Sequence, residues 1–301
     1  MITVTVITVI KDLTQSAEIV QRILSCTDYP SVNIVVKQGK PNGSLAGLYN
    51  EAAEAVNSDV LVFVHEDVYF KNPQWLQKIT NHLEEQPNTV IGVAGTKVYT
   101  KLAGTWPSLS EFTREDVYQG DIHYYVNPEN LAYDRVQVLD GCFLACLASV
   151  WQQLKFSNNL EGYHYYDIDF SLRAHNQGHF VTVLYGLGVE HMSSGRLNAA
   201  WVNATYTMRK QFSVSPVNSL LTNKHPAFHI IMHMKAAEFI NAIFFSGYPW
   251  KPISFFMYFI SVMKYLQFSE LKLALRYLLF GGIYSRVNKL MVAQKQYSRG
   301  A

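Results

Sequence analysis

Three polar side chains that can bind a metal ion follow directly on an unbroken apolar run. Residues 60–64 are Val-Leu-Val-Phe-Val, and His65, Glu66 and Asp67 come next. An uninterrupted apolar run of this length predicts a strand buried on both faces of a sheet. Ligands of open parallel sheets bind beyond the carboxyl ends of the strands, so the sequence predicts a site at this edge. Taken alone, the segment fits a polar loop after an ordinary strand equally well.

Two later segments favour a site. Asp167 and Asp169 are two residues apart, and Ile168 and Leu172 continue at helical spacing. This pattern predicts a helix that begins near the aspartates and presents both carboxylates at its positive end. His191 closes another strand-like run, which begins at residue 180, so we expect it at a sheet edge as well.

The elements that must position these residues begin at the N-terminus. The pattern predicts a strand over 1–10, an amphipathic helix over 14–25 and a second strand over 32–36, which is the start of a doubly wound α/β sheet. Ser44 is the expected N-cap of a helix over 45–56. The polar stretch 100–130 predicts a long irregular loop, and such loops often bind substrate or act as lids.

Together, the three polar segments resemble the inverting nucleotide-sugar glycosyltransferases of the GT-A fold, specifically the family 2 type that builds bacterial surface polysaccharides. The resemblance covers residues 1–212. It implies a Rossmann-like, doubly wound mixed sheet and a transferase of hexosyl or deoxyhexosyl groups. The donor would be a nucleotide-diphosphate sugar and the acceptor a hydroxyl of a glycan or of a lipid-linked molecule.

In that family an Asp-x-Asp-like motif holds a divalent cation, Mn²⁺ or Mg²⁺, on the donor diphosphate. His65-Glu66-Asp67 occupies its place here, with His in place of the first Asp. The resemblance also implies that His191 is a further metal ligand. Mixed imidazole and carboxylate ligands favour Mn²⁺ more than an all-oxygen set would.

A second family motif, Glu-Asp-x-Asp-x-x-x-Arg, corresponds to residues 166–173, with Tyr166 in place of Glu. The resemblance therefore implies that Asp167 is the general base. Asp169 would orient the base or bind the acceptor. Arg173, one turn further on, is expected to pair with a carboxylate rather than to touch substrate.

Further site residues follow from the same resemblance or, for the aromatic residues near the acceptor, from the way aromatic rings stack on sugars. Lys37 lies in a basic turn where the family has an Asp-rich, base-binding turn; it could reach phosphate or be solvated. The residues assigned to the donor are Lys37, Asn50, His65 and Asp67. Those assigned to the acceptor are Asp140, Gly141, His164, Tyr166 and Trp106. The alternative for the aromatic residues is that their rings pack in the core.

Composition limits the other function classes. The chain has 301 residues, 49% of them hydrophobic, and a formal net charge of +2, so it can bury a full core and shows no sign of binding nucleic acid. No glycine precedes Gly39, which argues against a dehydrogenase or nucleotidyltransferase with a glycine-rich phosphate loop. The remaining alternative is a non-catalytic binding or scaffold protein with the same fold.

The three cysteines lack zinc-type spacing and are expected to be buried thiols. Because Met1 leads straight into a strand pattern, we expect no export signal and a cytoplasmic protein.

The composition changes after residue 212, so we expect a catalytic domain over 1–212 and a helical region over 213–301. That region is basic and rich in aromatic residues at helical spacing, and Lys251 and Lys264 interrupt its longest apolar stretch. Amphipathic helices of this kind suit a peripheral contact, here through 228–297, with the inner face of a membrane. The alternative is that the aromatic residues pack within a helical subdomain or against a second subunit, as in a homo-oligomer.

Overall fold

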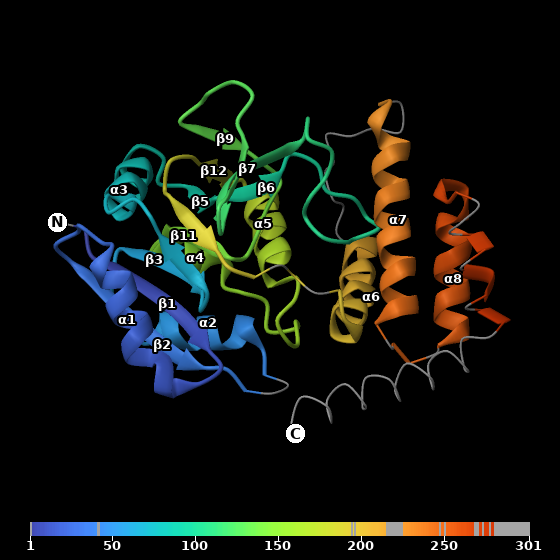
Figure 1. Ribbon diagram of the computed structural model, residues 1–301, viewed down its shortest axis with the longest axis horizontal. Helices are drawn as coiled ribbons and strands as arrows, with labels where there is room; N and C mark the ends of the chain where they lie inside the picture. Colours follow the sequence, from blue (N-terminus) through green and yellow to red (C-terminus); the bar gives the residue numbers. More distant parts are fainter. Residues whose placement is uncertain are drawn as a thin grey trace. The chain divides into compact units, whose positions relative to one another are not determined.

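The structure, a computed structural model, divides into two compact units (Figure 1). Unit 1 comprises Met1–Tyr99 and Trp106–Ser194, and unit 2 comprises Thr100–Thr105 and Gly195–Ala301. The residues that the structure describes are 2–40, 43–193, 195, 197–214, 225–246, 248–249, 251–267, 271–272, 274–276 and 278–279.

The main sheet of unit 1 has seven strands in the order β2-β1-β3-β11-β5-β12-β9. β1 is parallel to both β2 and β3, whereas β11 runs antiparallel to β3 and β5. The three parallel strands therefore end at one common edge. Their bounds, and those of the other strands, are β1 (Val4–Ile10), β2 (Val32–Gln38), β3 (Val60–His65), β5 (Thr89–Gly92), β9 (Tyr133–Arg135), β11 (Phe143–Leu147) and β12 (Phe180–Leu184).

Helices of unit 1 pack on this sheet, and both faces of β3 are buried. On one face Val60, Val62 and Val64 join a core with residues of α1 and α3. On the other face the Phe63 ring lies 5.1 Å from that of Tyr49 of α2 and 4.9 Å from that of Phe156. This two-sided burial explains the unbroken apolar run. The helices of unit 1 are α1 (Ser16–Ser25, after the 3-10 turn η1, Leu13–Gln15), α2 (Leu45–Glu54), α3 (Trp75–Glu85), α4 (Ala148–Leu154) and α5 (Tyr166–Asn176).

Local signals place several of these elements as predicted. Ser44 is the N-cap of α2, and its Oγ accepts a hydrogen bond from Gly47 N at 3.2 Å. α5 begins at Tyr166, so Asp167 and Asp169 lie in its first turn. Cys142 and Cys146 are buried free thiols and Cys26 is a partly buried one.

A second sheet, ordered β10-β6-β7-β13-β4, brings distant segments together. β13 runs antiparallel to β4, and His191 faces Val68 in this register. Because β4 follows β3 after a short turn, the pairing places His191 beside the His65–Asp67 segment. The strands are β4 (Val68–Phe70), β6 (Ala94–Thr96), β7 (Thr113–Gln119), β10 (Val138–Leu139) and β13 (Val189–His191).

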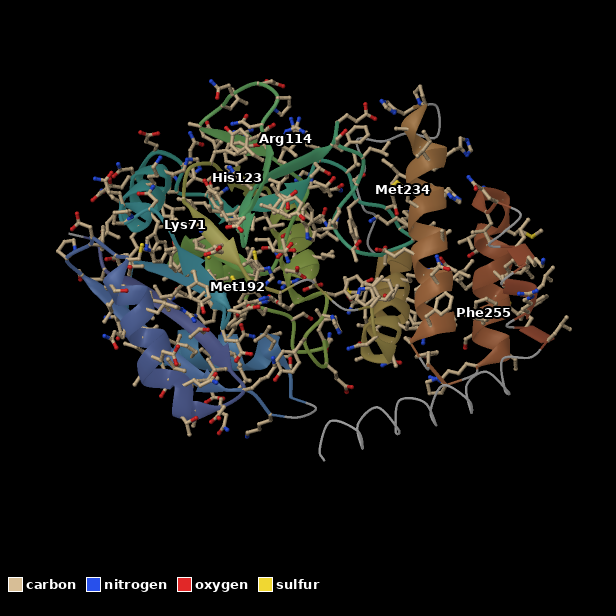
Figure 2. All side chains as sticks on the ribbon, in the orientation of Figure 1. Lys71, Arg114, His123, Met192, Met234 and Phe255 are labelled. Atoms are coloured by element: carbon tan, nitrogen blue, oxygen red, sulfur yellow. The ribbon has the colours of Figure 1, made fainter. Side chains whose placement is uncertain are left out.

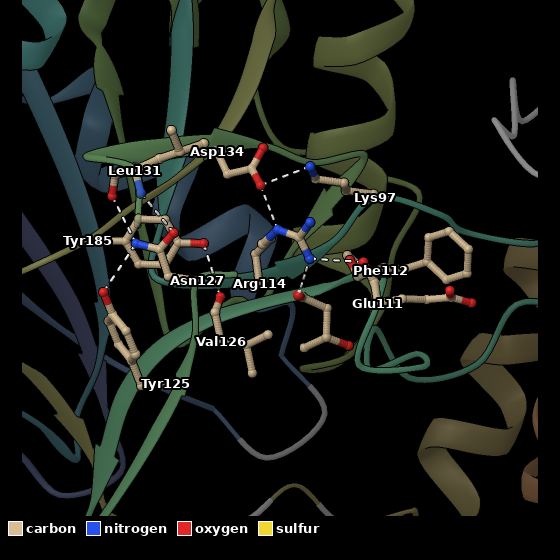
Figure 3. Close-up of polar contacts among 12 residues, drawn as sticks. Lys97, Glu111, Phe112, Arg114, Tyr125, Val126, Asn127, Leu131, Asp134 and Tyr185 are labelled. Carbon is tan, nitrogen blue, oxygen red and sulfur yellow. Dashed lines mark hydrogen bonds and ion pairs between the residues drawn. The ribbon is translucent and has the colours of Figure 1, made fainter. Parts of the chain in front are cut away.

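The expectation of a long irregular loop over 100–130 was wrong for residues 113–126, whereas 100–112 and 127–130 are irregular. Residues 113–126 form a hairpin of β7 and β8 (Ile122–Val126) in which Gln119 pairs with Ile122. The two-residue turn contains Gly120 at φ +59°, a conformation that glycine adopts without strain. A Gly-Asp pair between two strand-forming runs is the signal that could have predicted it. Arg114 of β7 is buried and bonded to Asp134, which also pairs with Lys97 at 2.8 Å (Figure 3).

Unit 2 consists of helices around an aromatic interior. Phe239 is fully buried, and its ring lies 5.1 Å from that of Tyr206 and 4.5 Å from that of Tyr258. Among the tail aromatics that the structure describes, Phe239, Tyr248, Phe255, Tyr258 and Phe259 are buried inside the helical unit, whereas Phe245 and Phe256 are exposed. The elements are α6 (Ala199–Val214), α7 (Ala227–Phe245), α8 (Pro252–Val262) and the 3-10 turn η2 (Met263–Tyr265).

The boundary between the units falls after residue 194, whereas the composition changes near residue 212. The reason for the difference is α6, whose composition is ordinary but whose buried residues pack with α7; the Trp201 ring lies 6.1 Å from that of Phe239. None of the described helices is both long enough and apolar enough to cross a bilayer. Residues 281–297 of the predicted membrane segment lie outside the described residues.

Candidate active site

A pocket of about 210 Å³ opens at the carboxyl edge of the three parallel strands. Its walls come from the ends of β1 and β3, from the turn after β2 and from the start of α2. Ligand pockets of α/β sheets occur at this edge. The lining residues are Val9, Ile10, Lys11, Gly39, Leu45, Tyr49, His65, Glu66, Asp67, Tyr163 and Ser193.

Side chains that can hold a cation converge at this pocket. One ligand atom each from His65, Asp67 and His191 lies within 4.8 Å of the others. His191 Nε2 is 3.4 Å from His65 Nδ1, 3.4 Å from an Asp67 carboxylate oxygen and 3.4 Å from Ser193 Oγ. Ligand atoms bound to one first-row ion at about 2.0–2.2 Å lie about 3–3.5 Å apart, so the spacing fits such an ion.

The hydrogen bonds of His65 determine which nitrogen can bind metal. Tyr166 Oη donates to Gly141 O at 2.7 Å, so its oxygen accepts from His65 Nε2, also at 2.7 Å. His65 Nδ1 then has no proton and presents its lone pair toward His191. A partner that fixes the tautomer in this way is typical of metal-binding histidines.

The surroundings of the pocket keep Asp67 and His65 in their metal-binding forms, whereas they favour the protonated form of His191, whose proton a bound cation would have to displace. Burial raises the pKa of Asp67, but hydrogen bonds from His191 and Ser193 outweigh it and bring that pKa well below its usual range. Burial and the charge of His191 lower the pKa of His65. Burial lowers the pKa of His191, yet its hydrogen bond to Asp67 and the charge of Asp140 raise it overall.

Asp167 is a different kind of carboxylate. Burial, together with the charge of Asp140, raises its pKa to about 7. The Gly141 N–H donates to its Oδ2 at 2.8 Å, which anchors the group against the turn after β10. A carboxylate with a pKa near neutrality can accept a proton from a substrate at neutral pH and release it later.

Asp169, by contrast, is held by Arg173. The Arg173 Nε donates to its Oδ2 at 2.8 Å, and the same guanidinium donates to the backbone oxygens of Leu154 and Lys155. The expected pairing of Arg173 with a carboxylate is confirmed. In this arrangement Asp169 orients Arg173, which ties α5 to the end of α4.

A protein-family model described as "Glycosyltransferase like family" matches residues 5–216 of the chain. The chain belongs to this family. It is therefore a glycosyltransferase, and the family expected from the three polar segments is confirmed. Its mixed α/β architecture with C-terminal helices is also the one predicted.

Solved structures resemble the glycosyltransferase weakly. Residues 1–349 of S. aureus TarS, solved with UDP-GlcNAc, are 15% identical to this chain, with a TM-score of 0.49. The match covers 99% of this chain and 92% of the TarS chain. The structure of the same TarS residues without that ligand gives a TM-score of 0.44. GalNAc-T7 with UDP, GalNAc and Mn²⁺ is 12% identical, with a TM-score of 0.48 over 68% of this chain. The matched part spans 48% of the GalNAc-T7 chain. No curated protein matches the sequence significantly.

Three predicted ligand residues of the glycosyltransferase lie away from the convergence point. The carboxylate of Glu66 accepts from Lys11 N at 2.8 Å and pairs with Lys11 Nζ at 2.9 Å. Lys37 Nζ pairs with Glu51 at 2.7 Å, and Lys37 does not line the pocket. Asn50 is buried and exchanges hydrogen bonds with both backbone groups of Phe156, so it fastens α2 to the segment before α5.

Four of the five predicted acceptor residues, Trp106, Asp140, Gly141 and Tyr166, are linked by hydrogen bonds and by the bond between Asp140 and Gly141 along the chain. The Trp106 indole N–H donates to one oxygen of Asp140, whose other oxygen accepts from Cys142 N at 2.7 Å. Gly141 lies against the start of α5. His164 is partly buried and precedes Tyr165, which has a left-handed backbone at φ +66° just before the helix.

Four lining residues with polar side chains were not predicted to bind the donor or the metal: Lys11, Tyr49, Tyr163 and Ser193. Lys11 is the first polar residue after the apolar β1 run, as His65 is at the end of β3, and this signal could have been used. Ser193 could have been proposed from its spacing to His191. Tyr49 reaches the pocket through the fold, and no local pattern indicates it.

Proposed function

We propose that the glycosyltransferase moves a sugar from a nucleotide-diphosphate donor to an acceptor hydroxyl by a cation-dependent, inverting displacement. One observation carries the proposal: ligand atoms of His65, Asp67 and His191 converge within 4.8 Å at a pocket beyond the ends of three parallel strands. The catalytic domain would comprise residues 1–212, and the family match over 5–216 supports this extent.

The residues present fit a divalent cation. Two imidazole nitrogens and a carboxylate oxygen favour a first-row ion such as Mn²⁺ over Mg²⁺. When bound, the cation would neutralise charge on the departing diphosphate as a Lewis acid. The free Nδ1 of His65 and the ionised Asp67 carboxylate are the forms that such binding requires.

Asp167 would act as the general base. The acceptor oxygen attacks the anomeric carbon and gives its proton to the Asp167 carboxylate, while the bond from that carbon to the diphosphate oxygen breaks with its electron pair. Attack opposite the leaving group inverts the configuration. The Trp106–Asp140 pair, in which Asp140 directly precedes the Gly141 anchor, supplies an aromatic ring and a carboxylate suited to sugar hydroxyls.

The helical unit would bring the enzyme to its acceptor. We propose a peripheral contact with the inner face of a membrane, where a glycan or lipid-linked acceptor would be presented. The basic composition of residues 224–301, with Glu238 and Glu270 as their acidic residues, supports this contact.

Metal removal tests the proposed function. Purified protein, treated with EDTA and assayed with a panel of UDP- and dTDP-sugars, should lose donor turnover and regain it with Mn²⁺. Asp67→Asn should weaken Mn²⁺ binding by about tenfold or more in calorimetry. His175→Ala, which changes an exposed histidine of α5, is the matched control and should behave as wild type. Turnover that is unaffected by EDTA would refute the cation-dependent mechanism.

A further inference from the structure

Helix α8 is apolar over most of its circumference. Its sequence from Pro252 to Val262 contains Ser254 and Ser261 but no charged residue. A helix of this kind is normally covered on all sides, either by protein or by lipid. It therefore matters which of its faces the rest of unit 2 covers.

One face of α8 packs inside unit 2. Phe255, Tyr258, Phe259 and Val262 are each at most 8% exposed and recur at helical spacing. The Tyr258 ring contacts Phe239 of α7, and the Arg209 guanidinium of α6 lies 3.9 Å above it. Figure 2 marks the position of Phe255 on α8. This face supplies the aromatic interior of the unit.

The opposite face is apolar as well, but it is exposed. Ile253 is 80% exposed, Met257 66%, Ile260 50%, Met263 48% and Phe256 47%. Their spacing of three and four residues places them along one side of the helix. Contiguous exposed apolar surface of this kind marks an interaction site on a soluble protein.

The charges beside this face indicate the partner. Exposed Lys251 and Lys264 lie at the two ends of α8, and exposed Lys272 and Arg276 follow. From residue 251 to residue 301 the sequence has eight Lys and Arg residues and one acidic residue, Glu270. A second copy docked on the same face would bring lysines against lysines, whereas a bilayer with anionic headgroups would complement them.

We propose that α8 is an in-plane membrane helix, which inserts Ile253, Phe256, Met257, Ile260 and Met263 into an anionic lipid surface. Its eleven residues make a helix only about 16 Å long, so it lies in the interface and does not cross the bilayer. The flanking lysines remain at the headgroups. The inference rests on the membrane contact proposed above and assigns it to one helix face.

Vesicle flotation tests the assignment. The full-length protein is mixed with vesicles of phosphatidylcholine, alone or with phosphatidylglycerol, at low and high salt. The wild type should float with the anionic vesicles and lose binding as salt is raised. The triple change Ile253→Gln, Met257→Gln and Ile260→Gln should reduce the bound fraction about tenfold or more.

The matched control replaces exposed apolar residues of unit 1, Leu24→Gln and Ile122→Gln, and should float as wild type. Circular dichroism should show unchanged melting for both variants, because all five side chains are exposed. If the wild type does not float, the membrane contact itself is refuted. If the triple variant floats as wild type does, the α8 assignment alone is refuted. A wild-type dimer that the triple change splits in sedimentation would assign the face to a second copy and overturn the proposal. None of these readouts depends on sugar transfer.

Discussion

His65 performs two tasks with its two ring nitrogens. Nε2 is held by Tyr166 at 2.7 Å, and this leaves Nδ1 facing His191 at 3.4 Å. Both residues depart from the family motifs: position 166 has Tyr in place of Glu, and position 65 has His in place of Asp. The two departures from the motif form one hydrogen-bonded pair.

This pairing predicts the effect of Tyr166→Phe. Loss of the hydroxyl leaves the His65 tautomer unselected, so Mn²⁺ affinity should fall about 10- to 100-fold. Calorimetric titration with Mn²⁺ alone measures the effect without a substrate. Tyr124→Phe, which removes an exposed hydroxyl of β8, should leave the affinity unchanged. Unaltered Mn²⁺ binding in Tyr166→Phe would show that the Tyr166–His65 hydrogen bond does not select the tautomer of His65 that binds the metal.

The raised pKa of Asp167 predicts a pH profile. The base works in its ionised form, and burial with the Asp140 charge raises its pKa to about 7. At saturating Mn²⁺, kcat/KM should therefore rise as pH increases and level off above about 7. Asp167→Asn should lower kcat about 10²- to 10⁴-fold and abolish this limb while leaving nucleotide binding intact. A wild-type profile that stays flat from about pH 5 to 8 would exclude Asp167 as the base.

At the scale of elements, the turn after β10 and the start of α5 fit together closely. A Cβ atom at position 141 would overlap Tyr166 Oη and lie 2.9 Å from Asp167 Cβ. Glycine is therefore required here for close approach rather than for an unusual backbone conformation.

Gly141→Ala should consequently displace both the general base Asp167 and Tyr166, whose hydroxyl holds His65. We expect kcat to fall by about 10²-fold or more, because small misplacement of reacting groups is costly. Gly178→Ala is a useful comparison, because its added Cβ meets no atom within 4 Å but its φ of +84° brings backbone strain alone. That variant should lose stability in thermal melting with kcat retained. Equal kcat in Gly141→Ala and wild type would show that this contact does not position the base.

At the scale of the whole molecule, unit 2 depends on a buried polar cluster. Glu238 of α7 accepts from Thr105 N at 3.1 Å and from Thr105 Oγ1, while Lys235, 5% exposed, donates to Thr105 O at 2.7 Å. The segment 100–105 thus joins the helical unit although it is remote from it in sequence.

Glu238→Ala should lower the free energy of unfolding by about 1–3 kcal/mol, because it leaves Thr105 N–H without its acceptor and Lys235 without a nearby carboxylate. Chemical denaturation followed by tryptophan fluorescence measures the change. Glu129→Ala removes an exposed acid of unit 1 and should change stability by less than about 0.5 kcal/mol. Identical unfolding of the two variants would show that the cluster contributes no stability.

Local patterns in the sequence were sufficient for the strands β1, β2 and β3, for the starts of α2 and α5, and for the family. The run before His65 had to be a buried strand because five consecutive apolar side chains need cover on both faces. Ser44 capped its helix because a side-chain oxygen satisfies a free N–H. The β7–β8 hairpin was missed because β7 is largely polar, although Gly120 marked the turn.

Only the tertiary structure decided which candidate residues meet. The antiparallel register of β13 with β4 places His191 against the segment of Asp67, and no property of either segment alone specifies that register. Successive side chains point in alternate directions. The Glu66 side chain therefore points toward Lys11, whereas those of His65 and Asp67 reach the point where the candidate metal ligands meet. The sequence by itself determined the chemistry of the available groups, because residue type sets donor atoms and intrinsic pKa values. Pairing between distant strands determined their distances, because it depends on contacts formed across the whole sheet.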